Sequence, residues 1–406
     1  MLKPDYDVVI VGAGMVGAAL ACMLDDSGLR VAVIEARPPQ THWPEGSVDL
    51  RVSAITAASR QIFSALGAWE RMRAFGVSPF QEMQVWDAAG DGAVHFEAAD
   101  IGAPYLGHII ENRVIQVALL AGIEQSAAVT LICPAAITAL QQEGQAVRLS
   151  LADGRSLTTA LVIGADGGNS RLRQLAGIST HGWSYDQQAV VAIVTTRLGH
   201  GETAWQRFLP EGPLAFLPLR DGRSAIVWSV SPAHARELLA MEAGVFCRAL
   251  GAAFDRRLGE VLETGARAAF PLRLQHTERY IGHRLALVGD AAHMIHPLAG
   301  QGVNLGLLDA AALAEVLQDA LAKGRDYFTS PVLRRYERWR KGDNLLTMLA
   351  MDGFKRCFST DFPPLRMLRN TGLRLVDATP PLKHRLIRQA MGMKGDLPKL
   401  ARGNCL

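Results

Sequence analysis

Residues 7–17 read DVVIVGAGMVG, an apolar run that passes into a glycine-rich turn. The turn has the spacing G-x-G-x-x-G, formed by Gly12, Gly14 and Gly17. The run predicts a buried strand, and the glycines allow a tight turn, close approach of the backbone to a pyrophosphate and close packing of a helix. A helix over 18–27 and a second strand over 30–35 follow. The stretch therefore predicts a βαβ unit whose helix N-terminus faces an anion.

Glu35 closes the second predicted strand. At this place a carboxylate accepts hydrogen bonds from both ribose hydroxyls of an adenosine, and it repels a 2′-phosphate. We therefore expect FAD or NAD at this site rather than NADP. Without Glu35, the strand and the helix, the three glycines would indicate only a tight turn.

Two further acidic turns follow predicted strands far along the chain. Asp166 comes after residues 161–163, and Asp290 comes after residues 285–288, each beside glycine. An aspartate at the carboxyl end of a strand can bond a ribityl hydroxyl, and glycine leaves room for the cofactor. Each motif alone would indicate an ordinary turn. Because a dehydrogenase requires neither, the two together favour a flavin nucleotide.

A glycine-rich loop after Asp290 opens onto an amphipathic helix predicted over 302–321. Free amides at the start of this helix can stabilise negative charge on a reduced flavin ring. The residues that we expect to contact the cofactor here are Gly300, Gly302, Val303 and Asn304. His293, His296 and Pro297 lie in the same loop.

The overall composition is that of an ordinary globular protein. The chain has 406 residues, 49% hydrophobic and 20% charged, with a formal net charge of +3. The length predicts two subdomains or an elaborated α/β unit, and the small charge gives no reason to expect a nucleic-acid partner. The five cysteines are scattered without a C-x-x-C pair, so we expect neither disulfides nor a metal site, and a reducing cytoplasm fits best.

Residues 8–24 carry no charge, which is close to the lower length limit of a membrane span. The fingerprint glycines explain this stretch better as strand, turn and helix, and Asp5 and Asp7 precede it where a signal peptide would be positive. Farther along, the apolar spacing of residues 50–67 predicts a helix, and residues 189–231 read as the strands of a separate sheet.

Five stretches carry a resemblance to a known family: LRVSAI at 50–55, GHIIEN at 107–112, the loop and helix start at 289–304, YER at 336–338 and LIRQAMG at 386–392. With these, the chain resembles from end to end the single-component flavoprotein hydroxylases of the para-hydroxybenzoate hydroxylase type. Within that superfamily it is similar to the ubiquinone-biosynthesis hydroxylases, and most of all to the VisC-type 2-octaprenylphenol hydroxylase.

The resemblance implies an α/β fold with a Rossmann-type FAD-binding domain assembled from separated pieces. The expected pieces are residues 1–75, 105–177 and 278–325. A β-sheet substrate domain is expected to be inserted between them, over 76–104 and 178–277. A helical C-terminal region is expected over 326–406.

The resemblance also implies further contacts and a reaction. Arg51 is expected to contact the cofactor, with Asn112 or Gln116 near its phosphates; an exposed ion pair is the alternative role for Arg51. Reduced flavin is expected to react with O2 to form a C4a-hydroperoxide that attacks a phenol ring. Pro297 is expected to shape the wall there, and His293 or His296 either moves a proton or caps a turn.

The implied substrates are a polyprenylated phenol and O2, with NAD(P)H or an electron-carrier protein as reductant. A flavin oxidase or reductase, and a flavin-holding subunit without activity, stay open as alternatives. Residues 366–402 contain nine Lys/Arg against two acidic residues, interleaved with leucines. This basic segment predicts contact with a membrane surface, with a ubiquinone-biosynthesis complex or with a second copy, or else a solvated face. The expected place is the cytoplasm, with peripheral contact to the inner membrane left open.

Overall fold

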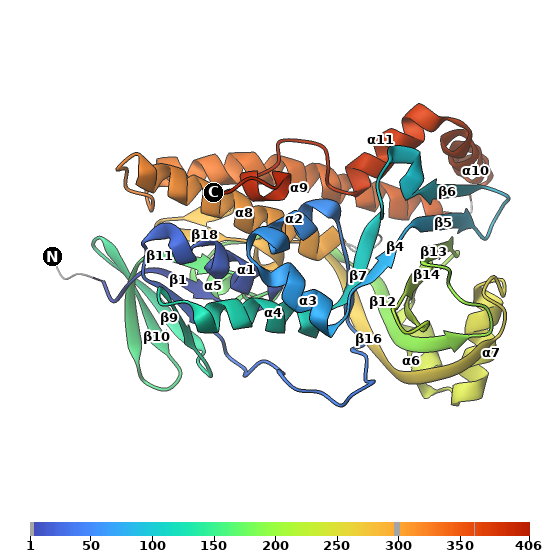
Figure 1. Cartoon of the computed structure of the whole chain (residues 1–406), viewed down its shortest axis with the longest axis horizontal. Coiled ribbons are helices and arrows are strands. Elements are labelled where there is room, and N and C mark those ends of the chain that lie inside the picture. Colours follow the sequence, from blue (N-terminus) through green and yellow to red (C-terminus); the bar gives the residue numbers. More distant parts are fainter. Residues whose placement is uncertain (1–3, 296–300, 361) are drawn as a thin grey trace.

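The computed structural model describes residues 4–295, 301–360 and 362–406. Two eight-stranded sheets lie side by side, and long helices run along one side of the molecule (Figure 1). These helices are α8 (Gln301–Ala322) and α9 (Ser330–Phe358), which pack on each other. The first sheet contains the predicted βαβ unit, and the second lies where a separate sheet was expected.

The first sheet has a parallel centre in the order β18-β11-β1-β2-β8, with β17 antiparallel at one edge. Its strands are β1 (Tyr6–Val11), β2 (Val31–Ile34), β8 (Val129–Ile132), β11 (Ser156–Gly164), β17 (Ile281–Gly282) and β18 (Leu285–Leu287), extended by the hairpin β9 (Ile137–Glu143) and β10 (Ala146–Leu151). Residues 8–11 are all buried in a core that also includes residues of α8 and of the hairpin strands β9 and β10. The central strands of a parallel sheet are covered on both faces and therefore need apolar side chains throughout. The uncharged stretch at 8–24 is thus sheet and helix core.

Helix α1 (Met15–Met23) follows β1 directly and packs between α4 (Asn112–Gln125) and α8. The short α5 (Arg171–Leu175) follows β11. Helices α1 and α5 begin shortly after β1 and β11, at the carboxyl edge of the parallel sheet, and α8 is the next helix after β19 (His293–Met294). Their N-termini therefore lie near the place where such sheets bind ligands.

The second sheet is mostly antiparallel, in the order β19-β16-β12-β15-β14-β13-β5-β6. Its strands are β5 (Glu82–Asp87), β6 (Ala93–Glu97), β12 (Thr180–Thr196), β13 (Thr203–Phe208), β14 (Pro213–Pro218), β15 (Ser224–Val230), β16 (Val261–Thr277) and β19 (His293–Met294). Helices α6 (Pro232–Ala240) and α7 (Ala243–Ala253) pack against its long strands, and Phe216, Trp228 and Phe246 form a separate core there. Strand β16 runs from this core to β19, beside the first sheet.

A small third sheet corrects one prediction. Residues 50–67 were expected to be helical, but β3 (Val52–Ile55) pairs with β7 (Gly107–Glu111), which also pairs with β4 (Ser78–Phe80). The helix α2 (Ala57–Ala65) starts only after Thr56, whose hydroxyl caps it by accepting from the Ser59 N–H. Helix α3 (Ala68–Phe75) follows. A long-range strand pairing therefore overrides the local helical spacing at 52–55.

The expected α/β class, with a second sheet and a helical C-terminal region, is confirmed; the residue limits of the domains stay predictions. Among the described residues, no helix combines the length and apolar character needed to cross a membrane. The chain ends in α10 (Pro363–Ala378), α11 (Pro380–Ala390) and a short turn at 399–402. Helices α10 and α11 lie beside β5 and β6, at the top right of Figure 1.

A buried ion pair holds α10 on this sheet. The Arg369 guanidinium donates to both carboxylate oxygens of Asp87, at 2.6 and 3.2 Å. The Asn370 amide also donates to Asp87, at 2.9 Å, and its oxygen accepts the Gly92 N–H at 2.6 Å. All three side chains are buried, so each charge depends on its partner.

The substitution Asp87→Ala is expected to destabilise the protein by about 3–5 kcal/mol, because it leaves the Arg369 charge buried without a counter-charge. The free energy of unfolding in urea measures this, and limited proteolysis within α10 reports local release. The control is Asp91→Ala, which removes an exposed pair with Arg374 and should change little. Equal effects of the two substitutions would contradict this account.

Candidate functional site

A cavity of about 880 Å³ lies at the carboxyl ends of β1, β2 and β11, which is where open α/β sheets bind ligands. Its volume is in the range of cofactor pockets. Ten of the residues predicted to bind the cofactor line it: Gly12, Gly14, Glu35, Arg51, Asn112, Gln116, Asp166, Asp290, Gly302 and Val303. The structure thus brings together residues that are up to 291 positions apart in the sequence.

The fingerprint glycines form a cradle that side chains would fill. Gly12 has φ +104°, and a Cβ on it would lie 2.5 Å from the Ala165 oxygen. A Cβ on Gly17 would lie 2.0 Å from the Gly12 oxygen, so Gly17 does not line the cavity but lets α1 pack against the turn. Nothing lies within 4 Å of the Cβ position of Gly14, which borders the cavity. This space and the start of α1 fit a pyrophosphate.

Glu35 is held at the end of β2. One carboxylate oxygen accepts the Ala13 N–H at 2.8 Å, and the other accepts the Arg37 N–H at 3.0 Å. Each oxygen has a second lone pair, so the carboxylate can still accept from the ribose hydroxyls of an adenosine. Gln116 fixes the same turn from α4 by donating to the Ala13 carbonyl at 2.8 Å.

The first turn of α4 also faces the cavity, through Asn112, Arg113 and Gln116. The Asn112 amide oxygen accepts from the Ser53 hydroxyl at 2.7 Å. A helix N-terminus favours phosphate through its free amides and its dipole. Arg51 lies on the lining with its guanidinium 5.7 Å from the centre of the Phe270 ring, and it has no ion-pair partner in the part of the chain described.

Two carboxylates on the lining need a ligand with hydrogen-bond donors. Asp166 Oδ2 accepts the Leu172 N–H at 3.0 Å, but its Oδ1 is buried and accepts from no described residue. Asp290 is accessible from the cavity, yet it lies deep in the protein, and this burial raises the pKa of its carboxyl. Hydroxyl groups of a ribityl chain are donors of the required kind. These carboxylates, with Glu35 and the glycine cradle, therefore fit FAD.

The loop before α8 contains three of the predicted site residues, His296, Pro297 and Gly300, which lie outside the described residues. Gly302 and Val303 line the cavity at the start of α8. Asn304 does not: its side chain is buried, with its oxygen accepting the Thr56 N–H at 3.0 Å and its nitrogen donating to the Ala54 carbonyl at 2.8 Å. The Asn304 side chain thus fixes the start of α8 against β3 and α2.

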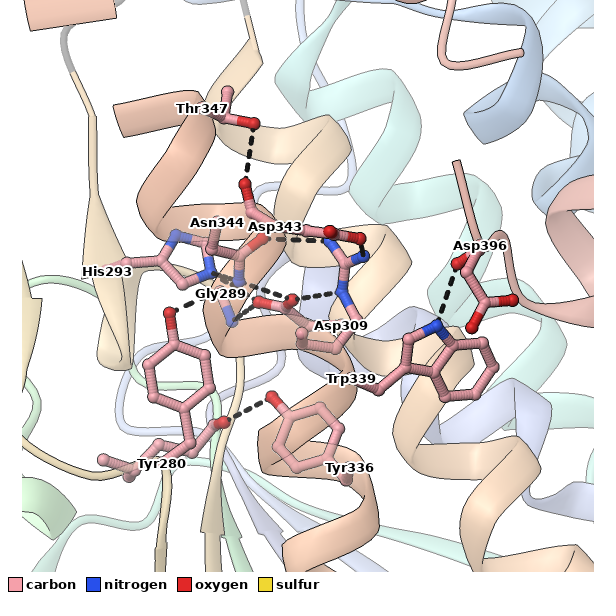
Figure 2. Close-up of polar contacts among 12 residues, drawn as sticks. Tyr280, Gly289, His293, Asp309, Tyr336, Trp339, Asp343, Asn344, Thr347 and Asp396 are labelled. Atoms are coloured by element: carbon pink, nitrogen blue, oxygen red, sulfur yellow. Dashed lines mark hydrogen bonds and ion pairs between the residues drawn. The ribbon is translucent and has the colours of Figure 1, made fainter. Parts of the chain in front are cut away.

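His293 is buried one layer behind the cavity, where it is bound by other side chains (Figure 2). Its Nε2 lies 2.5 Å from Asp309 Oδ2 and 2.9 Å from the Asn344 amide nitrogen. Asp309 Oδ1 accepts from Arg340 Nε at 3.0 Å and from the Asn344 amide at 2.9 Å. Asp309 Oδ2 also accepts the Gly289 N–H at 3.2 Å. We call His293, Asp309, Arg340 and Asn344 the buried polar network.

The network holds Asp309 ionised without contact with water. Burial alone would raise the pKa of this carboxyl, but His293, Arg340 and the Asn344 hydrogen bond more than offset it and lower the pKa to about 2. Because Gly289 precedes Asp290 directly, the same carboxylate fixes the backbone that carries Asp290 into the cavity. The network therefore positions the cavity wall.

The sequence did not reveal Asp309, Arg340 or Asn344. One available signal was that Asp309 is the one acidic residue among the apolar and small residues 305–314 of the predicted helix. A carboxylate there must be paired. The partners lie on another helix, and nothing local identifies them.

The substitution Gly17→Ala is expected to weaken FAD binding by on the order of tenfold to a hundredfold, because the added Cβ displaces the turn that holds the pyrophosphate. The ratio of flavin to protein absorbance after purification measures this. The control is Gly342→Ala, on α9, whose Cβ position has nothing within 4 Å. Full flavin content in Gly17→Ala would contradict the cradle.

The substitution Asp309→Asn is expected to lower the free energy of unfolding at neutral pH by about 3 kcal/mol. The folded-state pKa of Asp309 is about 2, below the ordinary 3.8, so its contribution is complete above that ordinary value and is lost as pH falls toward the folded one. The variant should therefore show a flatter dependence of stability on pH in this window, measured by urea unfolding. Asp343→Asn, at the exposed partner of Arg340, is the control.

Comparisons with known proteins agree with this site. A family model described as "FAD binding domain" matches residues 5–341. The "3-demethoxyubiquinol 3-hydroxylase" of Escherichia coli (strain K12) is 41% identical over 393 residues, covering 97% of this chain and all of that protein. The "Ubiquinone biosynthesis monooxygenase COQ6, mitochondrial" of Xenopus tropicalis is 39% identical over 435 residues, covering 94% of this chain and 92% of that protein.

Among solved structures, p-nitrophenol 4-monooxygenase PnpA of Pseudomonas putida DLL-E4 aligns with a TM-score of 0.79 at 19% identity, over 96% of this chain and 99% of that one. This likeness confirms the expected fold, that of the para-hydroxybenzoate hydroxylase type. The two relatives confirm the resemblance at the level of the family, without confirming the VisC-type assignment. The chain belongs to the FAD-dependent monooxygenases and, among them, to the hydroxylases of ubiquinone biosynthesis.

Proposed function

We propose that this protein hydroxylates the ring of a polyprenylated phenol similar to 2-octaprenylphenol. One observation carries the proposal: the polar cradle for the nucleotide continues, within one cavity, to the apolar residues Pro271, Leu272 and Ile295, which line it next to Arg273. Leu272 and Pro271 come from β16 of the second sheet, and Ile295 follows β19. An apolar ring can therefore lie between the second sheet and the flavin site.

The residues of the chain hold and orient the reactants. Glu35 and Asp166 would accept hydrogen bonds from hydroxyls of the cofactor, and the start of α4 would face its phosphates. When bound and reduced, the flavin supplies the activation of O2. Gly302 and Val303 lie in the first turn of α8 and line the cavity. Backbone N–H groups in the first turn of a helix have no partner within the helix, so these groups favour negative charge at this end of the cavity.

Apolar residues beside the ring would disfavour water there and so help to protect a reactive oxygen species from decay. Behind Leu272 and Ile295 lies a cluster that includes Tyr185, Leu274 and Met348. His293 faces Asp309 and Asn344 in this structure, which supports a positioning role rather than proton transfer to the substrate. The roles of His296 and Pro297 stay predictions from the sequence.

The proposal also has to name the ring carbon that is hydroxylated and the reductant that is used. The VisC-type resemblance predicts a 2-octaprenylphenol as substrate, whereas the Escherichia coli relative is named a 3-demethoxyubiquinol 3-hydroxylase. The reductant is NAD(P)H or an electron-carrier protein, since the sequence has no second nucleotide fingerprint. A lipid-tailed substrate supports a working place at the cytoplasmic face of the inner membrane.

The test is turnover of a short-chain prenylated phenol and a demethoxyubiquinol analogue under isotopically labelled O2. NADH, NADPH and a chemical reductant are compared as electron donors. The expected result is one labelled oxygen atom in the product, with the position of the hydroxyl given by mass spectrometry and NMR. If only one of the two substrates is turned over rapidly, the position of the new hydroxyl on that substrate identifies the ring carbon.

Other outcomes favour the remaining alternatives. Hydrogen peroxide without labelled product would indicate an oxidase. Neither product nor substrate-dependent O2 uptake, with flavin bound, would indicate a flavin-holding subunit. Either result would overturn the proposed hydroxylation.

A further inference from the structure

The outward face of the C-terminal helices is apolar. In the part of the chain described, twelve large apolar side chains within 345–393 are exposed, against seven in all other residues. Ten of them lie on the second half of α9, on α10 and on α11, whereas Phe362 precedes α10 and Met393 follows α11. Exposed apolar side chains that concentrate in one part of a protein mark an interaction site.

Helix α10 carries apolar side chains on its outer side as well as on its inner side. Leu365, Leu368 and Leu375 follow one another at helical spacing and are exposed, with Leu368 at 65%. On the inner side, Arg369 and Asn370 bond Asp87, and Leu373 and Val376 pack in the core beside them. The bonds to Asp87 fix the orientation of α10, which leaves the three outer leucines facing away from the protein.

Helix α9 has a similar arrangement along its second half. Asn344, Met348 and Asp352 recur every four residues on the inner face and are buried, with Asp352 accepting from the Tyr185 hydroxyl at 3.1 Å. Leu346 and Leu349 are on the outer face, 69% and 58% exposed. We call the exposed sides of α9, α10 and α11 within 345–393 the outer apolar face.

Basic side chains accompany the outer apolar face. Residues 345–394 contain nine Lys/Arg and three acidic residues. Arg366, Arg385, Arg388 and Lys394 are exposed, and none has an ion-pair partner among residues 4–295, 301–360 and 362–406. Leucines flanked by unpaired cations match the composition of surfaces that lie in the headgroup region of an anionic bilayer.

We propose that the outer apolar face docks peripherally on an anionic lipid surface. A two-fold contact between copies would bring these unpaired cations together, whereas anionic headgroups neutralise them. Met348, on the inner face of α9, packs in the same cluster as Leu272 and Ile295 of the cavity wall. Docking thus places lipid one helix away from the wall that the proposed substrate would contact. The proposal itself concerns binding and does not depend on the reaction.

The test is flotation of the FAD-loaded, full-length protein with vesicles of phosphatidylcholine alone or mixed with phosphatidylglycerol. We expect binding to the mixed vesicles that weakens with salt, and little binding to phosphatidylcholine. The variant Leu346→Gln/Met367→Gln/Leu368→Gln should bind on the order of tenfold or more weakly. Arg385→Gln and Arg388→Gln should each cost about fivefold on mixed vesicles.

The matched control is Leu198→Gln, at a leucine in the loop after β12 that is 54% exposed. It should float as the unchanged protein does. Unchanged thermal unfolding and flavin content show that each variant is folded. No binding of the unchanged protein, or equal binding by the triple variant, would refute lipid docking. A triple variant that instead shifts from dimer to monomer in size-exclusion chromatography would assign the face to a second copy.

Discussion

The carboxylate of Asp309 is the interaction on which the arrangement of the site depends. A buried charge costs several kcal/mol unless it is paired and hydrogen-bonded, and here four groups from three other segments supply the partners. Gly289 directly precedes Asp290 of the cavity lining, and His293 belongs to β19, which pairs with β16 of the second sheet. Arg340 and Asn344 lie in the middle of α9. The cavity wall, the apolar cluster around Met348 and the direction of the exposed side of α9 therefore share one electrostatic origin.

Asp87 has the corresponding role at the other end of the helical region. Asp309, on α8, ties α9 to the backbone that follows β18 of the first sheet, and Asp87 ties α10 to the second sheet. In both pairs an arginine from a C-terminal helix meets an aspartate from an earlier segment. The C-terminal helices are consequently a brace between the two sheets, and their solvent side is free to carry leucines that contribute nothing to the core.

The features that could be predicted from the sequence are those with local causes. Gly12, Gly14, Glu35, Asp166 and Asp290 each follow a recognisable strand, and the cavity lining includes them. Residues 52–55 were misassigned because the pairing of β3 with β7 depends on residues 107–111. The inward direction of the Arg369 side chain could not be predicted either, because the sequence of the basic segment is compatible both with arginines that face solvent and with an arginine that faces Asp87. Only the tertiary contacts decide between these readings.

The order of the strands has a consequence for how the chain matures. β18 joins the sheet beside β11, through pairs such as Val162 with Leu285, and the sheet begins with β1 at Tyr6. The ribosome must therefore release residue 287 before the first sheet can close, and α8, which contributes Asp309, comes later still. Until then the edge of β11 is unpaired and the apolar run at 8–11 is incompletely covered. Such non-local closure is slow, and it leaves apolar surface exposed in the partly folded chain during synthesis.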